Sequence, residues 1–327
     1  MKARIKFILR RLKAAANIGL DLLYDGRRFH RWSSSGKHTD LTPEELIGRI
    51  LAKAHSIEKG LSMPDPRPFF GTAALTELDR RLREFEGLCL DRNHPAYRKG
   101  RDVIQVYFQT HADRGLTPPA ELDYLKHWLA EPRQACIGGS LSLRASDVQA
   151  DAKGDFRTAS LSRHSIRMFR KDPVAPELVR EAVALAQRSP SVCNRQGCRV
   201  YVVEDPAKRR KALEIQGGNR GFTEEIQCLL VVVSSLPIFR DSKERNQGWV
   251  DGGLFSMSLL LALHHLGLGA CPLNWSAGRA KDRQLRALLG IPDKELVVML
   301  VGAGHLRDEF IVAASPRRPL DEVLQTV

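Results

Sequence analysis

The spacing of apolar residues differs between the two halves of the chain. In the first half, Leu, Ile, Val and aromatic residues recur every three or four positions, which is the period of amphipathic helices. Helices are expected over residues 2–24, 42–57, 72–90, 96–112 and 119–130. The polar stretch 26–40, rich in Ser and Gly, predicts a linker. The first half is therefore expected to be helical.

The second half adds short apolar runs that are typical of buried strands. Strands are expected over residues 199–204, 226–234, 270–273 and 295–304. They alternate with helices that are expected over residues 176–188, 206–215, 251–266 and 279–289. Strands and helices mixed around one sheet indicate an α/β or α+β sandwich. The pattern weakens from residue 136 to 157, which predicts three parts: a leader and linker (1–40), a helical region (41–150) and the sandwich (151–327).

Between two of the predicted helices, residues 55–71 carry prolines at three alternate positions. Prolines spaced in this way favour an extended path, because each one restricts the residue before it. Such a segment either covers a pocket, clamps a neighbouring subunit, or simply crosses from one helix to the next. His55 and Glu58 share a helix face here, but without further ligands they predict no metal site.

Charge narrows the classes of partner. The net charge is +13, but residues 1–40 hold ten Lys or Arg against three Asp, so about half of the excess lies in the leader. The other basic residues are spread along helices, and no helix-turn-helix, RNA-binding or zinc-finger pattern is present. No nucleic-acid partner is expected. No apolar run reaches the roughly 18–20 residues that a membrane span needs.

The leader itself combines an apolar stripe with basic residues. Ile5, Ile8, Leu9 and Leu12 lie on one helical face, while the Lys and Arg residues lie largely off it. Two interpretations stay open for residues 1–24. The helix either lies on an anionic membrane surface, or docks on this protein or on a partner subunit.

Six cysteines are scattered without a CxxC pair or a Cys/His cluster of zinc spacing. We expect them to be small buried apolar side chains, and free cysteines of this kind favour a location in a reducing cytoplasm. The cytoplasmic protein is expected to be soluble or peripheral at the inner membrane surface. Cys193 is expected to pack rather than to act as a nucleophile.

Two short stretches carry the candidate chemistry. Residues 163–167 form a basic turn that contains two Arg and a Ser, and such groups suit a phosphate, because Arg offers planar paired donors. Residues 189–196 form a small polar loop after the next helix, suited to the polar edge of a planar heterocycle. We interpret the two stretches as binding the two ends of one flavin mononucleotide (FMN).

From about Ser162 onward, the chain resembles the nitroreductase family of FMN enzymes. The matching motifs, in the family's order, are Arg163-x-Ser165-x-Arg167-x-Phe169 with Pro173-Val174, Ser189-Pro190-Ser191-x-x-Asn194-x-Gln196, Asn219 in GGNRGF, Gly267-Leu268-Gly269-Ala270-Cys271-Pro272, Gly290-Ile291-Pro292, Gly302-Ala303-Gly304 and Pro316-Arg317-Arg318. The resemblance implies an α+β, nitroreductase-like sandwich with a mostly helical N-terminal extension.

The resemblance also implies a set of cofactor-binding residues. Those expected around the phosphate are Arg163, His164, Ser165, Arg167, Arg317 and Arg318. Those expected around the flavin ring are Pro190 and Ser191 at its border, Asn194, Gln196 and Asn219 at its polar edge, and the backbone of Leu273, Asn274 and Trp275 facing N5. No catalytic side chain is implied, because flavin N5 carries the hydride.

The implied activity is a ping-pong FMN oxidoreductase, in which NADH or NADPH reduces the flavin and an electron-poor substrate takes the hydride. A homodimer with the flavin at its interface is implied, and the helix at 251–266 is our candidate for that interface. Two departures bear on the substrate. Gly197-Cys198 stands where the family often has Pro-Trp, and Phe222 stands three positions after Asn219, where the family often has a basic residue. Arg195 or Arg220 is then a candidate for stabilising the anion near flavin N1.

The helical extension resembles, less closely, nitroreductase-like proteins of surface-polysaccharide biosynthesis, through the segment from His55 to Pro68. A sugar-conjugate substrate follows from this resemblance. The alternatives are other flavin chemistry (dehalogenation, dehydrogenation or flavin breakdown) and a non-enzymatic flavin-fold scaffold at the membrane surface.

Overall fold

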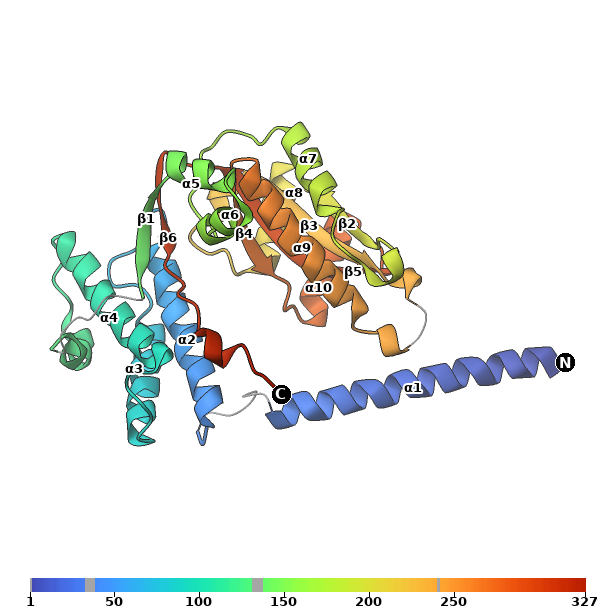
Figure 1. The fold of residues 1–327 in the computed structure, drawn as a ribbon, viewed down its shortest axis with the longest axis horizontal. Coiled ribbons are helices and arrows are strands. Elements are labelled where there is room, and N and C mark those ends of the chain that lie inside the picture. Colours follow the sequence, from blue (N-terminus) through green and yellow to red (C-terminus); the bar gives the residue numbers. More distant parts are fainter. Residues whose placement is uncertain (1, 33–38, 131–137, 240–241) are drawn as a thin grey trace. The chain divides into compact units, whose positions relative to one another are not determined.

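The computed structural model describes residues 2–32, 39–130, 138–239 and 242–327. They form two compact units that are each interrupted in sequence. The first unit contains α1 (Lys2–Trp32) and residues 171–305, and the second contains residues 38–170 and 306–327 (Figure 1).

A four-stranded antiparallel sheet is the centre of the first unit. Its strand order is β2 (Cys198–Val202), β3 (Cys228–Ser235), β5 (Glu295–His305), β4 (Leu268–Asn274). Every residue of β3 is buried, as its apolar, Val-rich sequence predicts for a central strand. All four predicted strands are present, with no bound shifted by more than two residues.

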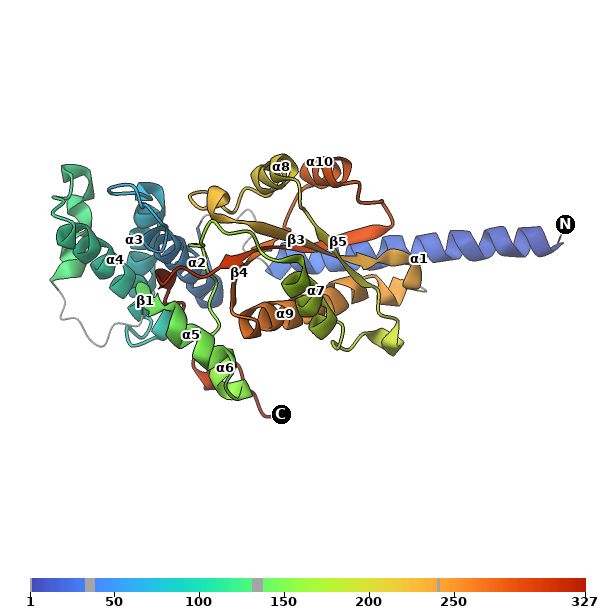
Figure 2. The same cartoon turned by 90° about the horizontal axis from the view of Figure 1, so that it is seen from above.

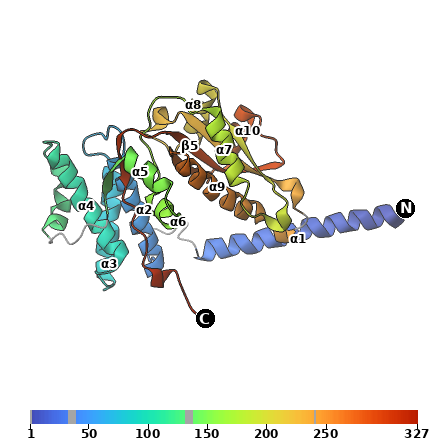
Figure 3. The ribbon, with the colours of Figure 1, turned by 45° about the horizontal axis from the view of Figure 1, so that its top comes forward.

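Helices cover both faces of this sheet. On one face lie α7 (Pro176–Ala186) and α9 (Gln247–His265), which run side by side (Figure 3). On the other face lie α8 (Pro206–Gln216) and α10 (Arg279–Leu289) (Figure 2). Successive side chains of β3 point to opposite faces of the sheet. Leu230 and Val232 pack in the core on the face that α7 and α9 cover, while their neighbours point to the face that α8 and α10 cover. The predicted α+β sandwich is therefore confirmed.

The second unit is mostly helical, as predicted. It contains α2 (Pro43–Leu61), α3 (Thr72–Gly87), α4 (Pro95–Asp113) and a 3₁₀ helix at Ala120–Leu129, packed around one apolar core. The start of α2 follows from its sequence. Thr42 accepts a hydrogen bond from the backbone of Glu45, and the Glu45 side chain accepts one from the backbone of Thr42, which completes a capping box.

Three elements of the second unit were missed where the sequence pattern weakens. They are β1 (Ser140–Arg144), α5 (Ala145–Ala152) and α6 (Phe156–Ser162). β1 pairs with β6 (Glu309–Ala313), also missed, in a two-stranded antiparallel sheet. The second unit continues to residue 170, whereas the sequence predicts a boundary near 150.

The leader also differs from its prediction. α1 continues to Trp32, so residues 26–32 are helical and not linker, since this stretch contains Arg residues that favour helix and no proline. Residues 33–38 of the predicted linker lie outside the described residues. Residues 4–20 are exposed, and Asp25 accepts hydrogen bonds from Arg245 at 2.8 and 2.9 Å. Among the described residues, no helix has both the length and the apolarity to cross a bilayer.

Candidate functional site

A cavity of about 710 Å³ in the second unit brings together four separate parts of the chain. We call it the basic cavity. Its charged and imidazole side chains are His55, Lys99, Arg163, His164, Arg167 and Arg317. Ser165 also lines it, and no Asp or Glu is among its lining residues in the part of the chain that the structure describes. Five of the six predicted phosphate residues, with no opposing carboxylate in the described lining, make a site for an anion.

Buried neighbours fix the turn that carries these arginines. Ile166 and Phe169 are buried, and Phe169 forms a β-bridge with Leu306. The Nε of Arg307 donates a hydrogen bond of 3.0 Å to the carbonyl oxygen of Phe169. The turn is thus tied to the C-terminal segment, which continues through β6 to Arg317. This tie explains how residues about 150 positions apart line one cavity.

The pKa of His164 reflects the positive charge of the basic cavity. Burial lowers the pKa of His164, and the charges of Arg163 and Arg317 lower it further. The imidazole is therefore neutral near pH 7. A bound anion would oppose the effect of the two arginines and raise this pKa.

The structure separates the two predicted C-terminal arginines. Arg317 lines the basic cavity and donates to the carbonyl oxygen of Ser315. Arg318 does not line it, and its Nη1 lies 3.7 Å from a carboxylate oxygen of Glu322. Arg317 is accordingly the better phosphate candidate.

The polar loop at 189–196 lies in the first unit and is strained. Cys193, Asn194 and Gln196 have φ values of 48°, 53° and 51°, in the left-handed region that residues other than Gly seldom adopt. Asn194 and Gln196 are exposed. Three such residues within four positions persist only where surrounding structure holds them, and such strain is typical of functional sites.

Two side chains outside the predicted set hold this loop. The buried carboxylate of Asp251, on α9, accepts hydrogen bonds from the Val192 backbone at 3.3 Å and from Gln247 at 2.7 Å. Glu244 accepts two hydrogen bonds from Arg195, at 2.6 and 2.9 Å. Arg195 also donates to the carbonyl oxygen of Ile238 at 2.6 Å. Arg195 therefore anchors the loop in this structure.

The remaining ring-side residues form a cluster around Gln216. The buried Asn219 donates to the carbonyl oxygen of Leu213 and to the Gln216 side chain, at 2.7 and 2.9 Å, and accepts from Thr223 at 2.6 Å. Gln216 in turn donates to the carbonyl oxygen of Asn274 at 3.0 Å. Both N–H groups of the Asn219 amide are thus engaged, so donation from this amide to a flavin requires the network to open.

The end of β4 holds the last predicted ring residues. Leu273 and Trp275 are buried, Asn274 is exposed, and the Trp275 indole donates to Asp282 at 3.0 Å. The strand registers place the start of β2 and the end of β4 at the same end of the sheet. Three strand spacings separate these two edge strands, which is roughly 14 Å.

Comparison with known proteins bears on what these features do. Residues 161–218 and 214–305 match the nitroreductase family. The chain is 31% identical over 201 residues to a protein of Thermus thermophilus named NADH dehydrogenase, covering 52% of this chain and 95% of that protein. The chain belongs to the nitroreductase family.

Further relatives are similar over about the same half of this nitroreductase. A Bacillus subtilis protein named FMN reductase [NAD(P)H] is 28% identical over 179 residues, covering 50% of this chain and 70% of that protein. A solved Desulfovibrio desulfuricans structure, described as a nitroreductase in complex with FMN, is 24% identical with a TM-score of 0.45. It covers 53% of this chain and 97% of that one.

Packing bears on two of the residues that depart from the family motifs. A Cβ added at Gly197 would collide with the Ile238 side chain, so the position holds the residue without one. Phe222 is buried in the core, where a basic side chain would lose its hydration.

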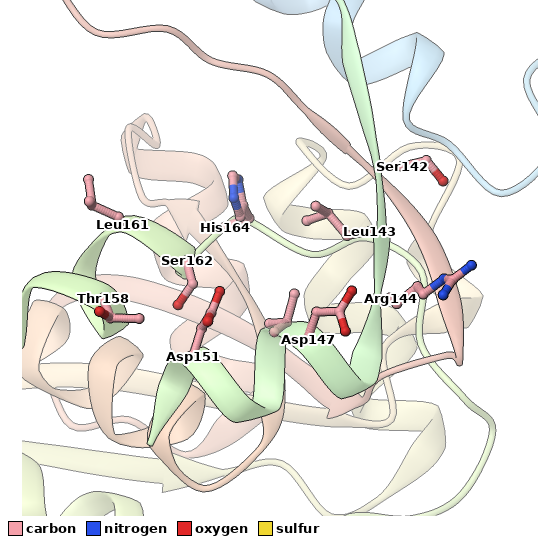
Figure 4. Close-up of a pocket in the computed structure, with 10 residues that line it drawn as sticks. Ser142, Leu143, Arg144, Asp147, Asp151, Thr158, Leu161, Ser162 and His164 are labelled. Carbon is pink, nitrogen blue, oxygen red and sulfur yellow. The ribbon is translucent and has the colours of Figure 1, made fainter. Parts of the chain in front are cut away.

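A second cavity of about 610 Å³ in the second unit shares Leu161 and His164 with the basic cavity. Figure 4 shows Asp147 and Asp151 one turn apart on α5, with the side chain of Ser162 pointing toward Asp151. Its carboxylates and hydroxyls give it an opposite chemistry to that of the basic cavity. The polar, irregular sequence of 140–162 gave no signal for this cavity.

Proposed function

We propose that this nitroreductase is an FMN-dependent NAD(P)H oxidoreductase that transfers a hydride to an electron-poor substrate. Family membership and relatives named NADH dehydrogenase and FMN reductase [NAD(P)H] support both the flavin and the nicotinamide donor. The sequence-based prediction of a flavin-dependent oxidoreductase is confirmed at this level. The identity of the substrate, including a sugar conjugate, stays a prediction, as do the other flavin chemistries.

The basic cavity is the observation that carries the proposal. A flavin phosphate has a charge of about −1.5 to −2 near neutral pH and three acceptor oxygens. Arg163, Arg167 and Arg317 offer paired donors to such a group, and the cavity lining contains no carboxylate to compete with it. The residues present therefore fit the phosphate of FMN.

The strained loop, in the first unit, offers groups that suit a flavin ring. Its left-handed backbone exposes the side chains of Asn194 and Gln196, which offer amide donors and acceptors to a flavin edge. Asp251 keeps the loop in place through the Val192 backbone. When bound, FMN supplies the centre that accepts and donates the hydride, and the protein binds and orients it.

The spectrum of the purified protein tests the proposal. A yellow protein with flavin absorbance, bleached by NADH or NADPH without oxygen and recoloured by an electron acceptor, is expected. A colourless protein that cannot be reconstituted with FMN would refute it. Replacing Arg163 and Arg167 by Ala is expected to release FMN, whereas Arg157→Ala, an exposed arginine on α6 outside both cavities, is the matched control.

A second copy of the chain is our proposed partner for the outer face of α9. Its exposed apolar residues are Trp249, Val250, Leu254 and Met257, close in spacing to successive helical turns. Apolar area gathered on one helix supports an interface. Light scattering is expected to give a dimer, and Leu254→Glu with Met257→Glu is expected to give a monomer. A monomeric wild type would exclude this interface.

An anionic membrane surface is our proposed contact for residues 1–24. The exposed apolar residues of α1, including Ile5, Ile8 and Leu12, are flanked by Lys and Arg. Sedimentation with anionic vesicles, compared with neutral ones and with a chain lacking residues 1–24, tests this contact. A cytoplasmic location is proposed with it, and the five described cysteines, all free, support a reducing compartment.

A further inference from the structure

The helical region contributes two side chains to the basic cavity. His55 comes from α2 and Lys99 from α4, and both line the cavity together with the arginines. The Lys99 side chain is only 6% exposed, so its charge is not solvated at the open surface. A buried ammonium in a cavity without lining carboxylates needs a reason, since burying a charge is costly unless it is paired.

Part of the reason is Glu58, which lies behind the lining and is fully buried. Its Oε2 is 3.0 Å from Lys99 Nζ and 3.3 Å from His55 Nδ1, and its Oε1 accepts from the Gly139 backbone at 3.2 Å. One carboxylate thus holds both cavity-lining side chains in place.

The ion pair with Glu58 does not use all the N–H donors of the Lys99 ammonium. An ammonium has three N–H donors, and Glu58 takes one of them. Among the described residues, Lys99 has no other acceptor. The cavity carries four permanent cations: Lys99, Arg163, Arg167 and Arg317.

We propose that Lys99 is a ligand of the FMN phosphate, held in position by Glu58. The helical region then completes the phosphate site of the nitroreductase. This inference rests on the proposed function, because it takes FMN as the occupant. Lys99 touches the phosphate, whereas Glu58 is a positioning residue that acts through Lys99.

The preference for FMN over riboflavin isolates the phosphate contact, because the two flavins share the ring. Apoprotein is titrated with each flavin, and the ratio of the two Kd values is compared between variants. Lys99→Met is expected to weaken FMN binding by roughly 10- to 100-fold, the range of one hydrogen bond to a charged group, and to leave riboflavin binding unchanged. Lys53→Met on α2, which removes the same charge outside the cavity lining, is the control and is expected to keep the ratio.

Lys99→Met leaves the Glu58 carboxylate buried without its cation, so the variant can fail to fold. The same substitution is therefore also made in a Glu58→Gln background, where no uncompensated charge remains, and compared with Glu58→Gln alone. On the wild type, FMN is expected to protect Lys99 from an amine-reactive reagent, as read by mass spectrometry.

An unchanged FMN-to-riboflavin ratio in either folded Lys99 variant, or the absence of protection of Lys99, would overturn the inference. If the arginine variants still lose FMN in that case, the proposed function stands and only the role of Lys99 falls. If the wild type binds neither flavin, the proposed function falls as well.

Discussion

Asp251 gives the sharpest test of how the strained loop is held. The substitution Asp251→Asn keeps the size of the side chain and removes its charge and one of its two acceptor oxygens. The Asp251 carboxylate accepts from the Val192 backbone and from Gln247. Gln247 donates to Oδ1 of Asp251, and the Val192 backbone N–H lies 3.3 Å from both Oδ1 and Oδ2. In the amide, an N–H₂ group replaces one of these two oxygens and opposes the Val192 donor.

A buried donor left without an acceptor costs about 1–3 kcal/mol. With Asp251 only 2% exposed, water does not replace the lost bond, and about 2 kcal/mol is the expected loss of stability. For a unit of this size each kcal/mol lowers Tm by roughly 2–4 °C, so the melting midpoint is expected to fall by roughly 4–8 °C. Because the loop carries Asn194 and Gln196, the affinity for riboflavin is expected to fall as well.

Differential scanning calorimetry of the apoprotein and fluorescence titration with riboflavin measure the two effects. Asp293→Asn, an exposed aspartate of the same unit, is the matched control and is expected to change neither. An Asp251→Asn protein with the wild-type melting midpoint and the wild-type riboflavin affinity would show that the carboxylate does not hold the loop.

Three further predictions concern pH, thiol reactivity and packing. The folded-state pKa of His164 is lowered, so the folded protein binds fewer protons than the unfolded chain. The stability that His164 contributes is full above about pH 6.5 and is lost as the pH falls through its folded-state pKa. His164→Gln is therefore expected to flatten this part of a profile of Tm against pH. A variant with the wild-type slope would contradict this prediction. Burial, assisted by the charge of Asp251, raises the pKa of Cys198 to about 11. At pH 8, alkylation is therefore expected at the exposed Cys193 well before Cys198, and mass spectrometry measures the order. Gly197→Ala is expected to lower Tm because its Cβ meets Ile238, and Ile238→Val is expected to restore part of the loss; a double variant no more stable than the single one would refute the clash.

Elements with a strong local signal could be predicted from the sequence. The capping box at Thr42 fixed the start of α2, and the apolar, Val-rich run of β3 identified the central strand. β1 and β6 could not be found in this way. Each is five residues long and partly exposed, and its partner lies about 170 residues away, so no local pattern marks the pairing.

In the candidate site too, some residues could be predicted from the sequence and others could not. Motif residues such as Arg163 and Asn194 could be named from their resemblance to the family. Their supports Asp251, Glu244 and Gln216 could not, because only the folded chain brings each of them to its partner. Asp251 did leave a trace in the sequence, since it is an acidic residue at the head of an otherwise apolar helix.

The pairing of β1 with β6 has a consequence for the order in which the protein matures on the ribosome. The second unit begins before the sandwich in the chain but includes residues 306–327, which are translated after all of 171–305. Its two-stranded sheet and Arg317 therefore arrive only after the strands and helices of the sandwich have been synthesised. Domains tend to fold as units during synthesis, with the N-terminal one first. Here the unit that begins before the sandwich is completed only after it, so the basic cavity is assembled late in translation.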